Sequence, residues 1–392
     1  MPSWIKLITM ALLFNLVTCT ATGCWNNQDL SETSIAAAMG LDKAEDNKIE
    51  LTVQLVNPSA LKSAQEGGES SNKASWTLSK TGETVFEANR NLLSTANNKI
   101  LHNHIQIIII GETLARDGIT RILDFLERGN QTNRKADILI AKGTTAKEIL
   151  SLQSELGNIP SINLANTIDN EDSIGKIKKI MFTDLMKELA TPGKDPAIGV
   201  VEIMNDKEQL FIKDMKIEGA AAFKKDKLAF WLSPVQTRGL LFVESKISSA
   251  VINIPNPLER STKVAIEVIS SKAKTSVELK DGSPVFNIEI NEQGDIVEQQ
   301  DGGDLSSPEA VEKLKKETET AIANEVRNSI QLALDNRCDL MGFGDKLHKE
   351  YPQYWNKVKG NWDEELSRVQ FNIKVSSDIG RVGLVKTSVL PK

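Results

Sequence analysis

Residues 107–111 read Ile-Ile-Ile-Ile-Gly, and this run decides how the first half of the chain folds. Isoleucine favours strands, and four in a row fit a strand that is buried on both faces better than a helix. Strands of that kind occur in sheets that helices cover on both sides. We therefore expect residues 100–110 to form a central strand of a mixed α/β layer.

The segments that flank this run alternate between helical and strand patterns. Residues 84–96 and 112–127 carry apolar residues three or four positions apart, as amphipathic helices do, and Gly118 splits the second segment. Residues 136–142 predict another buried strand, and residues 145–150 predict a short helix. The alternation predicts helices that pack on a sheet with some parallel strand pairing.

A β-hairpin is predicted before this layer. Residues 34–41 are small and apolar, and residues 48–56 alternate between apolar and polar, which is typical of a half-buried strand. Residues 42–47 form a polar turn between them. Residues 63–73 have no apolar pattern and predict a mobile loop, whereas residues 75–79 predict another strand.

The second half begins with a polar helical region at residues 163–189, which Pro192-Gly193 closes. Short strands are predicted next, at residues 198–204, 215–223, 227–232 and 240–242. Ile254-Pro255-Asn256-Pro257 ends this part. The last part predicts strands at residues 262–269 and 285–290 around an Asp281-Gly282 turn, then a long helix capped by Ser307, and a final strand at residues 371–375.

These patterns predict the α+β class, with three mixed α/β domains in which helices cover sheets. The expected divisions are a signal peptide at residues 1–23, an N-terminal mixed α/β domain at 24–190, a mainly β middle domain at 191–257 and a C-terminal α+β domain at 258–392, with its long helix at about 308–335.

The amino terminus has the layout of a secretory signal. Lys6 precedes an apolar run at residues 7–17, which is shorter than the roughly 20 residues that a membrane-spanning helix needs. The run leads to Ala21-Thr22-Gly23-Cys24, and bacterial lipoprotein signals end on such a cysteine. We expect cleavage before Cys24 and acylation of its thiol; Cys19 is the poorer candidate, and a plain secreted protein is the alternative.

Composition narrows the function further. The chain has 47 basic and 53 acidic side chains and a net charge of −6, which argues against a nucleic-acid-binding protein. With Cys19 removed and Cys24 acylated, only Cys338 remains, so we expect no disulfide within the chain. There is no nucleophile elbow, phosphate loop or zinc-protease motif, and we expect a protein that is not an enzyme.

Binding motifs are also sparse. His102 and His104 would share one face of a strand, but zinc needs at least three protein ligands and the sequence places no third one nearby. We therefore expect a hydrogen-bonded structural histidine there, and no metal or cofactor. Gly342-Phe343-Gly344 follows a helix, and we expect it to be a helix stop. Trp25, Tyr354 and Trp355 are candidate partner contacts, although such aromatic residues more often close a core.

Several short motifs, taken in order, resemble one family. They are Cys24-Trp25-Asn26, residues 87–90, His104, residues 111–119, residues 123–128, Gly219-x-Ala221-x-Phe223, Asp226-Lys227-Leu228, Thr237-Arg238-Gly239, Asp339-Leu340-x-Gly342-Phe343-Gly344, Tyr351-Pro352, Trp355 and Trp362. The order is similar to that of the Ger(x)C family of spore-germination lipoproteins, which are C subunits of germinant receptors. Asn26, Ala21 and Phe230-Trp231 depart from the family pattern.

This resemblance implies a non-enzymatic lipoprotein on the outer face of the spore inner membrane. Its acylated Cys24 would insert into membrane lipid and anchor the protein, which would act with two multi-spanning partners, the receptor A and B subunits. Two other classes stay open from the residues alone. A solute-binding lipoprotein of a transport system would show two similar lobes around a deep cleft, and a secreted hydrolase would show convergent carboxylates with perturbed pKa values.

Overall fold

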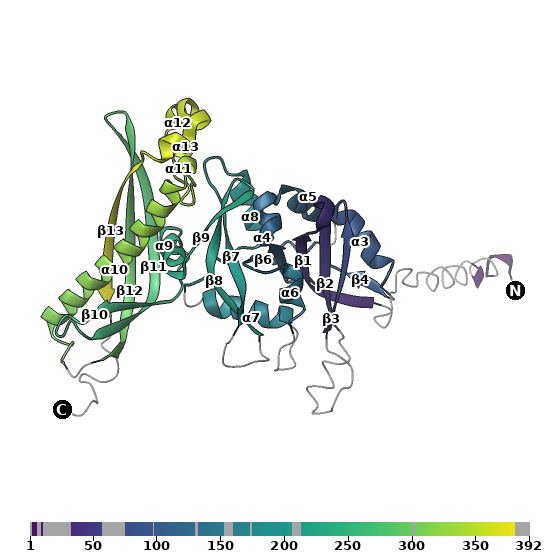
Figure 1. Cartoon of the computed structure of the whole chain (residues 1–392), viewed down its shortest axis with the longest axis horizontal. Helices are drawn as coiled ribbons and strands as arrows, with labels where there is room; N and C mark the ends of the chain where they lie inside the picture. The colour runs from purple at the N-terminus through teal and green to yellow at the C-terminus, as the bar shows by residue number, and fades with distance from the viewer. Residues whose placement is uncertain are drawn as a thin grey trace.

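The structure is a computed structural model. It describes residues 2–5, 9–10, 33–56, 75–96, 98–129, 132–152, 160–172, 175–205, 213–300 and 303–380. The loop predicted at residues 63–73 lies outside this part of the chain. The described strands belong to two sheets that lie next to one another along the long axis of the molecule (Figure 1).

The first sheet has nine strands within the described residues. They are β1 (Thr33–Lys43), β2 (Ile49–Val56), β3 (Ser75–Gly82), β4 (Lys99–Leu101), β5 (Ile107–Gly111), β6 (Asp137–Ala141), β7 (Ala197–Asn205), β8 (Lys213–Lys224) and β9 (Lys227–Leu232). Their order is β3-β2-β1-β5-β6-β7-β8-β9, and β4 also pairs with β1. The central strands β1, β5, β6 and β7 are parallel, whereas the flanking pairs are antiparallel.

Helices cover both faces of the first sheet, as the isoleucine run predicts. One face packs against α3 (Val85–Leu93), α4 (Glu112–Asp117), α5 (Thr120–Arg128) and α8 (Phe182–Ala190). The other face packs against α6 (Ala146–Leu150) and α7 (Pro160–Asp172) (Figure 1). All four isoleucines of β5 are buried between these layers, which confirms the predicted strand. Gly118, at φ 126°, separates α4 from α5 as expected.

The N-terminal hairpin is confirmed, with a short 3-10 helix at Glu45–Asn47 between β1 and β2. The segment expected to form one strand over residues 100–110 instead forms β4 and β5, which pair with different stretches of β1. Residues 102–106 between them are not in a strand. His102 and His104 therefore do not share a strand face, and that expectation was wrong.

The strand predicted at residues 240–242 was also wrong, because these residues lie in α9 (Pro234–Val243). Ser233 accepts a hydrogen bond from the Gln236 backbone, and Pro234 occupies the first turn, so this helix has a strong start signal. Residues 237–243 are all buried in the described structure. A helix that is buried on every side has no helical periodicity, and a short apolar run of that kind looks like a strand.

The second sheet has the order β10-β11-β12-β13. Its strands are β10 (Ala250–Pro255), β11 (Lys263–Lys280), β12 (Ser283–Gln299) and β13 (Gln370–Ile379). The predicted turn is confirmed by positive φ angles at Asp281 and Gly282. The long helix α10 (Pro308–Asp335) begins at Ser307, as expected, and packs its buried stripe against this sheet. Both strands of the β11–β12 hairpin extend well beyond their predicted ends.

Short helices connect α10 to β13. They are α11 (Phe343–Glu350), α12 (Pro352–Val358), a 3-10 helix at Lys359–Asn361 and α13 (Trp362–Leu366). Gly342, expected to stop a helix, instead adopts the left-handed conformation immediately before α11 and begins that helix. The glycine is required because φ is 71° at this position, a region that side chains with a Cβ disfavour.

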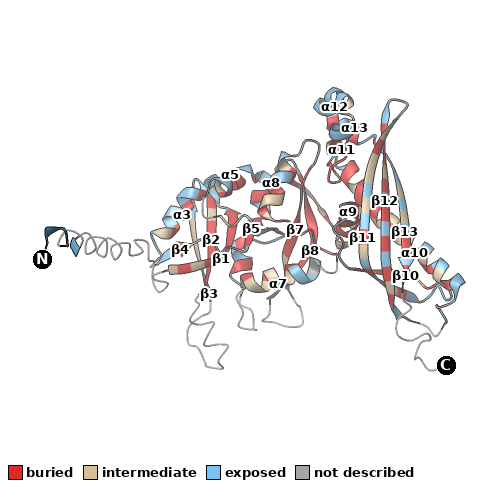
Figure 2. Cartoon of the chain, turned by 180° about the vertical axis from the view of Figure 1, so that it is seen from behind, coloured by how far each residue is buried: buried red, intermediate tan, exposed pale blue. Residues whose placement is uncertain are grey.

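The expected middle domain does not have a sheet of its own. Strands β7, β8 and β9 continue the first sheet, while α9 lies between the two sheets (Figure 1). Figure 2 shows that buried residues run along the strands of both sheets and across the contact between them. No helix among the described residues is long and apolar enough to span a membrane.

Candidate functional site

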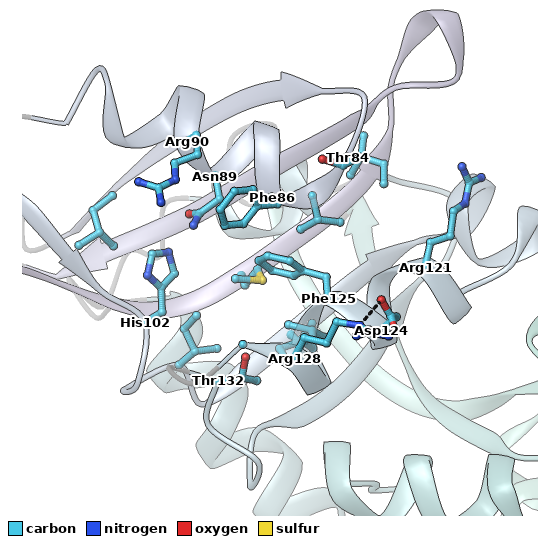
Figure 3. Close-up of a pocket in the computed structure, with 18 of the residues that line it drawn as sticks. Thr84, Phe86, Asn89, Arg90, His102, Arg121, Asp124, Phe125, Arg128 and Thr132 are labelled. Carbon is cyan, nitrogen blue, oxygen red and sulfur yellow. Dashed lines mark hydrogen bonds and ion pairs between the residues drawn. The ribbon is translucent and has the colours of Figure 1, made fainter.

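A cavity of about 1010 Å³ opens on the face of the first sheet that α3, α4, α5 and α8 cover. It lies between α3, α5 and the segment that follows β4, and we call it the α3–α5 cavity (Figure 3). Its apolar surface comes from Met39, Ile49, Val85, Phe86, Leu93, Ile100, Ile105, Ile108, Phe125 and Leu126. A cavity of this size and composition falls in the range of small-molecule sites.

The local sequence explains why α3 presents two kinds of side chain to the cavity. Thr84 caps the helix by accepting a hydrogen bond from the Glu87 backbone. Val85, Ala88 and Leu92 then fill the core, since they recur at helical spacing. The adjacent helix positions, including Phe86, line the cavity instead, and the Phe86 side chain is 56% exposed.

His102 is the most buried polar group of the α3–α5 cavity, at 9% exposed. Its ring hydrogen-bonds to the Ile100 backbone, while Nε2 has no partner in the described part of the chain. Burial lowers the pKa of His102, so the ring is neutral at pH 7 and Nε2 carries a lone pair. Oδ1 of Asn89, on α3, is likewise buried without a hydrogen-bond partner.

Basic side chains surround the opening of the cavity. The Arg128 guanidinium donates to both carboxylate oxygens of Asp124 at 2.9 Å, so these two charges are matched. Arg90 lies with Cζ 5.1 Å from the centre of the Phe86 ring. Neither Arg90 nor Arg121 forms an ion pair within the described residues. Within the described part of the chain, the rim therefore has positive charge that no ion pair matches.

A second cavity, of about 940 Å³, lies where the first sheet meets the short helices α11–α13. Its polar centre is a group of five residues that we call the junction cluster: Asp195, Lys224, Asp339, Trp362 and Asp363. The Lys224 ammonium donates to Asp195 at 3.0 Å and to Asp363 at 2.7 Å. The contact with Asp363 links the end of β8, in the first sheet, to α13, which precedes the last strand of the second sheet.

Asp339 organises the other half of the junction cluster. It accepts hydrogen bonds from the backbone N–H groups of Phe343 and Gly344, at 2.8 and 2.7 Å, and from the Trp362 indole at 3.0 Å. Burial raises the pKa of Asp339 to about 6, although these donors favour its ionised form. The aspartate therefore fixes the start of α11 and holds α13 against it.

A buried ion cluster lies close to the same contact. The fully buried Lys178 pairs with Glu244, which follows α9, and with Glu188 of α8 at 3.4 Å. Burial acts to raise the pKa of Glu244, but attraction by Lys178, Lys194 and Lys246 outweighs it and lowers the pKa to about 2. Lys178 and Glu244 are therefore both charged over the whole neutral range.

The motifs Thr237-Arg238-Gly239 and Asp339-Leu340-x-Gly342-Phe343-Gly344 build these contacts. Arg238 of α9 donates to Glu325 of α10 at 2.8 Å. A Cβ on Gly193 would lie 2.6 Å from Cα of Gly344, so two glycines allow the loop before β7 and α11 to approach closely. The long-range contacts give these motifs a structural role.

The structure describes some, but not all, of the residues that the sequence singles out. Cys24 and Trp25 lie outside the described residues. Trp355 is only 5% exposed and packs edge to face on Trp362, with ring centres 5.3 Å apart, so its ring belongs to the core. Tyr354 is half-buried against the same core. Cys338 is a free, buried thiol that donates to the Phe223 carbonyl.

The α3–α5 cavity was missed by sequence reasoning. Residues 87–90 and 123–128 are motifs of the family pattern, but nothing in the sequence indicates that they face one another. The sequence predicts a structural role for His102, and in the structure its Nε2 has no hydrogen-bond partner among the described residues. No group of three potential metal ligands occurs among the residues that the structure describes.

The chain is similar to known proteins over nearly the same residues that contain these motifs. Residues 26–203 match the family described as "Spore germination protein N-terminal domain", and residues 218–383 match "Spore germination B3/ GerAC like, C-terminal". Spore germination protein KC of Bacillus subtilis (strain 168) is 26% identical over 390 residues, with 96% of each chain covered. Spore germination protein B3 of that strain is 25% identical, with 93% of this chain and 95% of its own length covered.

A solved structure shows the same fold. The crystal structure of the GerBC protein matches with a TM-score of 0.57 and 20% identity, and it covers 87% of this chain and 96% of its own. The class predicted from the sequence, α+β with several domains, is confirmed by this match. The two family matches and the germination proteins that align over almost the whole length lead to one conclusion: the chain belongs to the Ger(x)C family of spore germination proteins.

Proposed function

We propose that this chain is a lipid-anchored subunit of a spore nutrient germinant receptor. Acylated Cys24 would hold it on the outer face of the spore inner membrane, where it would assemble with the multi-spanning A and B subunits. The observation that carries this proposal is the nearly full-length similarity to spore germination proteins, together with a match to the N-terminal family domain that begins at residue 26, two residues after Cys24. The anchor would then lie immediately before the family-defined part of the chain.

The physical benefit of such an anchor is a high local concentration. Two or three acyl chains, each stabilised by about 0.8 kcal/mol per buried methylene, would hold the chain durably on the bilayer. Binding to a neighbouring membrane subunit then becomes an encounter in two dimensions, with an effective concentration set by the tether length. Weak surface contacts are sufficient for assembly under those conditions.

We propose a role without catalysis. The buried titratable groups Lys178, Glu244 and Asp339 are held in ion pairs and hydrogen bonds between α8, α9, α11 and α13. Among the described residues, burial raises the pKa of three carboxyl groups, and these lie in different parts of the fold: Asp339 (to about 6) at the junction, Glu292 (to about 7) on β12 and Asp42 on β1. They do not converge, as the acid and base of a hydrolase would.

The solute-binding alternative is not favoured by the described architecture. A mixed sheet of nine strands and a sheet of four strands under one long helix are not two similar lobes. The cavity between them is crossed by the Lys224 contacts to Asp195 and Asp363. Such cross-links restrain the opening and closing that a two-lobed binding protein uses.

The anchor can be tested with a matched pair of cysteine variants. Cys24→Ala should move the protein from the membrane fraction to the soluble fraction of spores and impair nutrient germination, whereas Cys19→Ala should change neither. Mass spectrometry of the wild-type N-terminal peptide should find diacylglycerol on Cys24. Membrane retention and normal germination of the Cys24→Ala strain would overturn the proposal.

A further inference from the structure

We propose that the α3–α5 cavity binds a small molecule that has an apolar body, a hydrogen-bond donor and an anionic group. The inference rests on the side chains that line this cavity and does not depend on the membrane role proposed above. Three features of the described lining support it: two facing phenyl rings, two buried acceptors without hydrogen-bond partners and two arginines that form no ion pair with another described residue.

The phenyl rings define the place of the apolar body. Phe86 of α3 and Phe125 of α5 face one another across the cavity (Figure 3). Phe86 is 56% exposed, although it lies on a helix whose neighbouring apolar residues are buried. Met39 and Ile108 of the underlying strands form part of the floor. A flat apolar group between the rings would remove this surface from water, which is the main favourable term in ligand binding.

The donor requirement follows from His102 and Asn89. Figure 3 shows both side chains at one end of the cavity, beside Arg90. Nε2 of His102 and Oδ1 of Asn89 are buried acceptors, and no described group donates to either. Buried polar atoms in native proteins nearly always have partners, and each exception requires an explanation. An N–H or O–H group of a ligand at this end would satisfy them.

The anion requirement follows from the charges at the rim. The lining includes Arg90, Lys99, Arg121 and Arg128 against Glu83 and Asp124. Because Arg128 is already paired with Asp124, the cations at Arg90 and Arg121 remain available to a ligand. A planar guanidinium binds a carboxylate through two parallel hydrogen bonds. Arg90 lies beside the two unsatisfied acceptors, so one end of the cavity can bind both the donor and the anionic group of a ligand.

Three probes separate these features. Indole-3-acetate has the apolar body, the N–H donor and the carboxylate, whereas indole lacks the carboxylate and 1-naphthaleneacetate lacks the donor. Binding to the full-length chain in lipid nanodiscs can be measured by ligand-observed NMR, with empty nanodiscs as the blank. We expect indole-3-acetate to bind with a Kd on the order of 1 mM, and each of the other two probes to bind about five- to tenfold more weakly.

Variants assign the effects to residues. Arg90→Gln should weaken indole-3-acetate about fivefold and leave indole unchanged, and His102→Phe should weaken indole-3-acetate while leaving 1-naphthaleneacetate unchanged. Arg260→Gln is the matched control, because Arg260 is exposed and pairs with Glu317 of the second-sheet part. Since Arg90 is exposed, its variant retains the fold even if His102→Phe does not. Equal affinity for the three probes, no saturable binding, or an unchanged Kd in Arg90→Gln would overturn the proposal.

Discussion

The indole N–H of Trp362 donates to Oδ2 of Asp339 across 3.0 Å, and both residues are buried where the second half of the chain meets the first sheet. The same carboxylate accepts the backbone N–H groups at the start of α11. The backbone N–H of Asp339 in turn donates to Asp195, which is 144 residues away in the sequence. The Asp339 side chain thus joins α11 to α13, and its backbone joins both to the loop before β7.

Replacing Asp339 by Asn should destabilise this contact. Three N–H donors converge on two carboxylate oxygens, and asparagine presents an NH₂ group to at least one of them. We predict that the free energy of unfolding falls by about 1–3 kcal/mol in urea denaturation at pH 7. Asp345→Asn is the control, since Asp345 forms only a partly exposed pair with Lys349 and should change the free energy by less than about 1 kcal/mol. Equal effects of the two variants would contradict the assignment.

Gly239→Ala tests the packing of α9 on α10. Alanine is the better helix former by about 1 kcal/mol, so an exposed helical glycine would gain stability from this change. At Gly239 the added Cβ would instead collide with the backbone carbonyl of Glu325. We predict a lower melting temperature, equivalent to a loss of about 1–3 kcal/mol. Gly360→Ala should be neutral or stabilising, because nothing lies within 4 Å of a Cβ there; a stable Gly239→Ala protein would show that α9 is free to shift.

Lys178→Met removes the buried cation between α8 and α9. Glu188 and Glu244 would then be left buried with less positive charge, and we predict a loss of about 3–5 kcal/mol in the free energy of unfolding. Lys179→Met, which affects a more exposed pair with Asp169, should lose less than about 1 kcal/mol. A small loss in both variants would mean that the buried charges are compensated by other groups.

The same cluster should contribute to acid unfolding. The pKa of Glu244 is lowered to about 2 in the folded chain from the ordinary value of about 4.5, so its contribution to stability is present above about pH 4.5 and is lost as pH falls toward 2. Lys178→Met should therefore lose less stability than the wild type over that interval. Parallel acid titrations of the two proteins, followed by circular dichroism, measure this difference.

Glu292 should change the pH dependence of stability in the direction opposite to that of Glu244. It is buried on β12, where burial and the carboxylates of Asp378 and Glu319 raise its pKa to about 7 despite the Ser377 hydroxyl donor. Because the folded pKa is raised, the protein gains stability at low pH and loses it as pH rises from about 4.5 to about 7. The loss is on the order of 3 kcal/mol, since one pKa unit corresponds to about 1.4 kcal/mol.

Glu292→Gln should remove this part of the pH dependence. The difference in unfolding free energy between pH 5 and pH 7.5 should shrink in Glu292→Gln, whereas Glu289→Gln, on the exposed face of the same strand, should leave it unchanged. Identical pH profiles of Glu292→Gln and the wild type would show that Glu292 is not the titrating group.

Most secondary structure could be predicted because local pattern and tertiary environment agree. Four isoleucines predicted a strand buried on both faces, and Ser307 with Pro308 fixed the start of α10. The prediction failed where burial removed the pattern. Residues 240–242 are buried on all sides of α9, so the periodicity that distinguishes a helix from a strand is missing.

The sites were less predictable because they depend on contacts between distant segments. The pairing of β7 with β6 makes the strands of the expected middle domain part of the first sheet, and the sequence of neither strand alone predicts this pairing. The α3–α5 cavity likewise brings His102 beside residues of α3 and α5. Sequence motifs identified several of these residues, but their partners required the three-dimensional structure.

We propose that this chain assembles, through its anchor at Cys24, with multi-spanning receptor subunits. The most direct test of this proposal is co-purification of the tagged chain from detergent-solubilised spore membranes, with the recovered proteins identified by mass spectrometry. We expect the A and B subunits to be recovered with the wild type and with Cys19→Ala, and to be lost with Cys24→Ala. Recovery of a transporter permease instead, or equal recovery of the receptor subunits with Cys24→Ala, would contradict it.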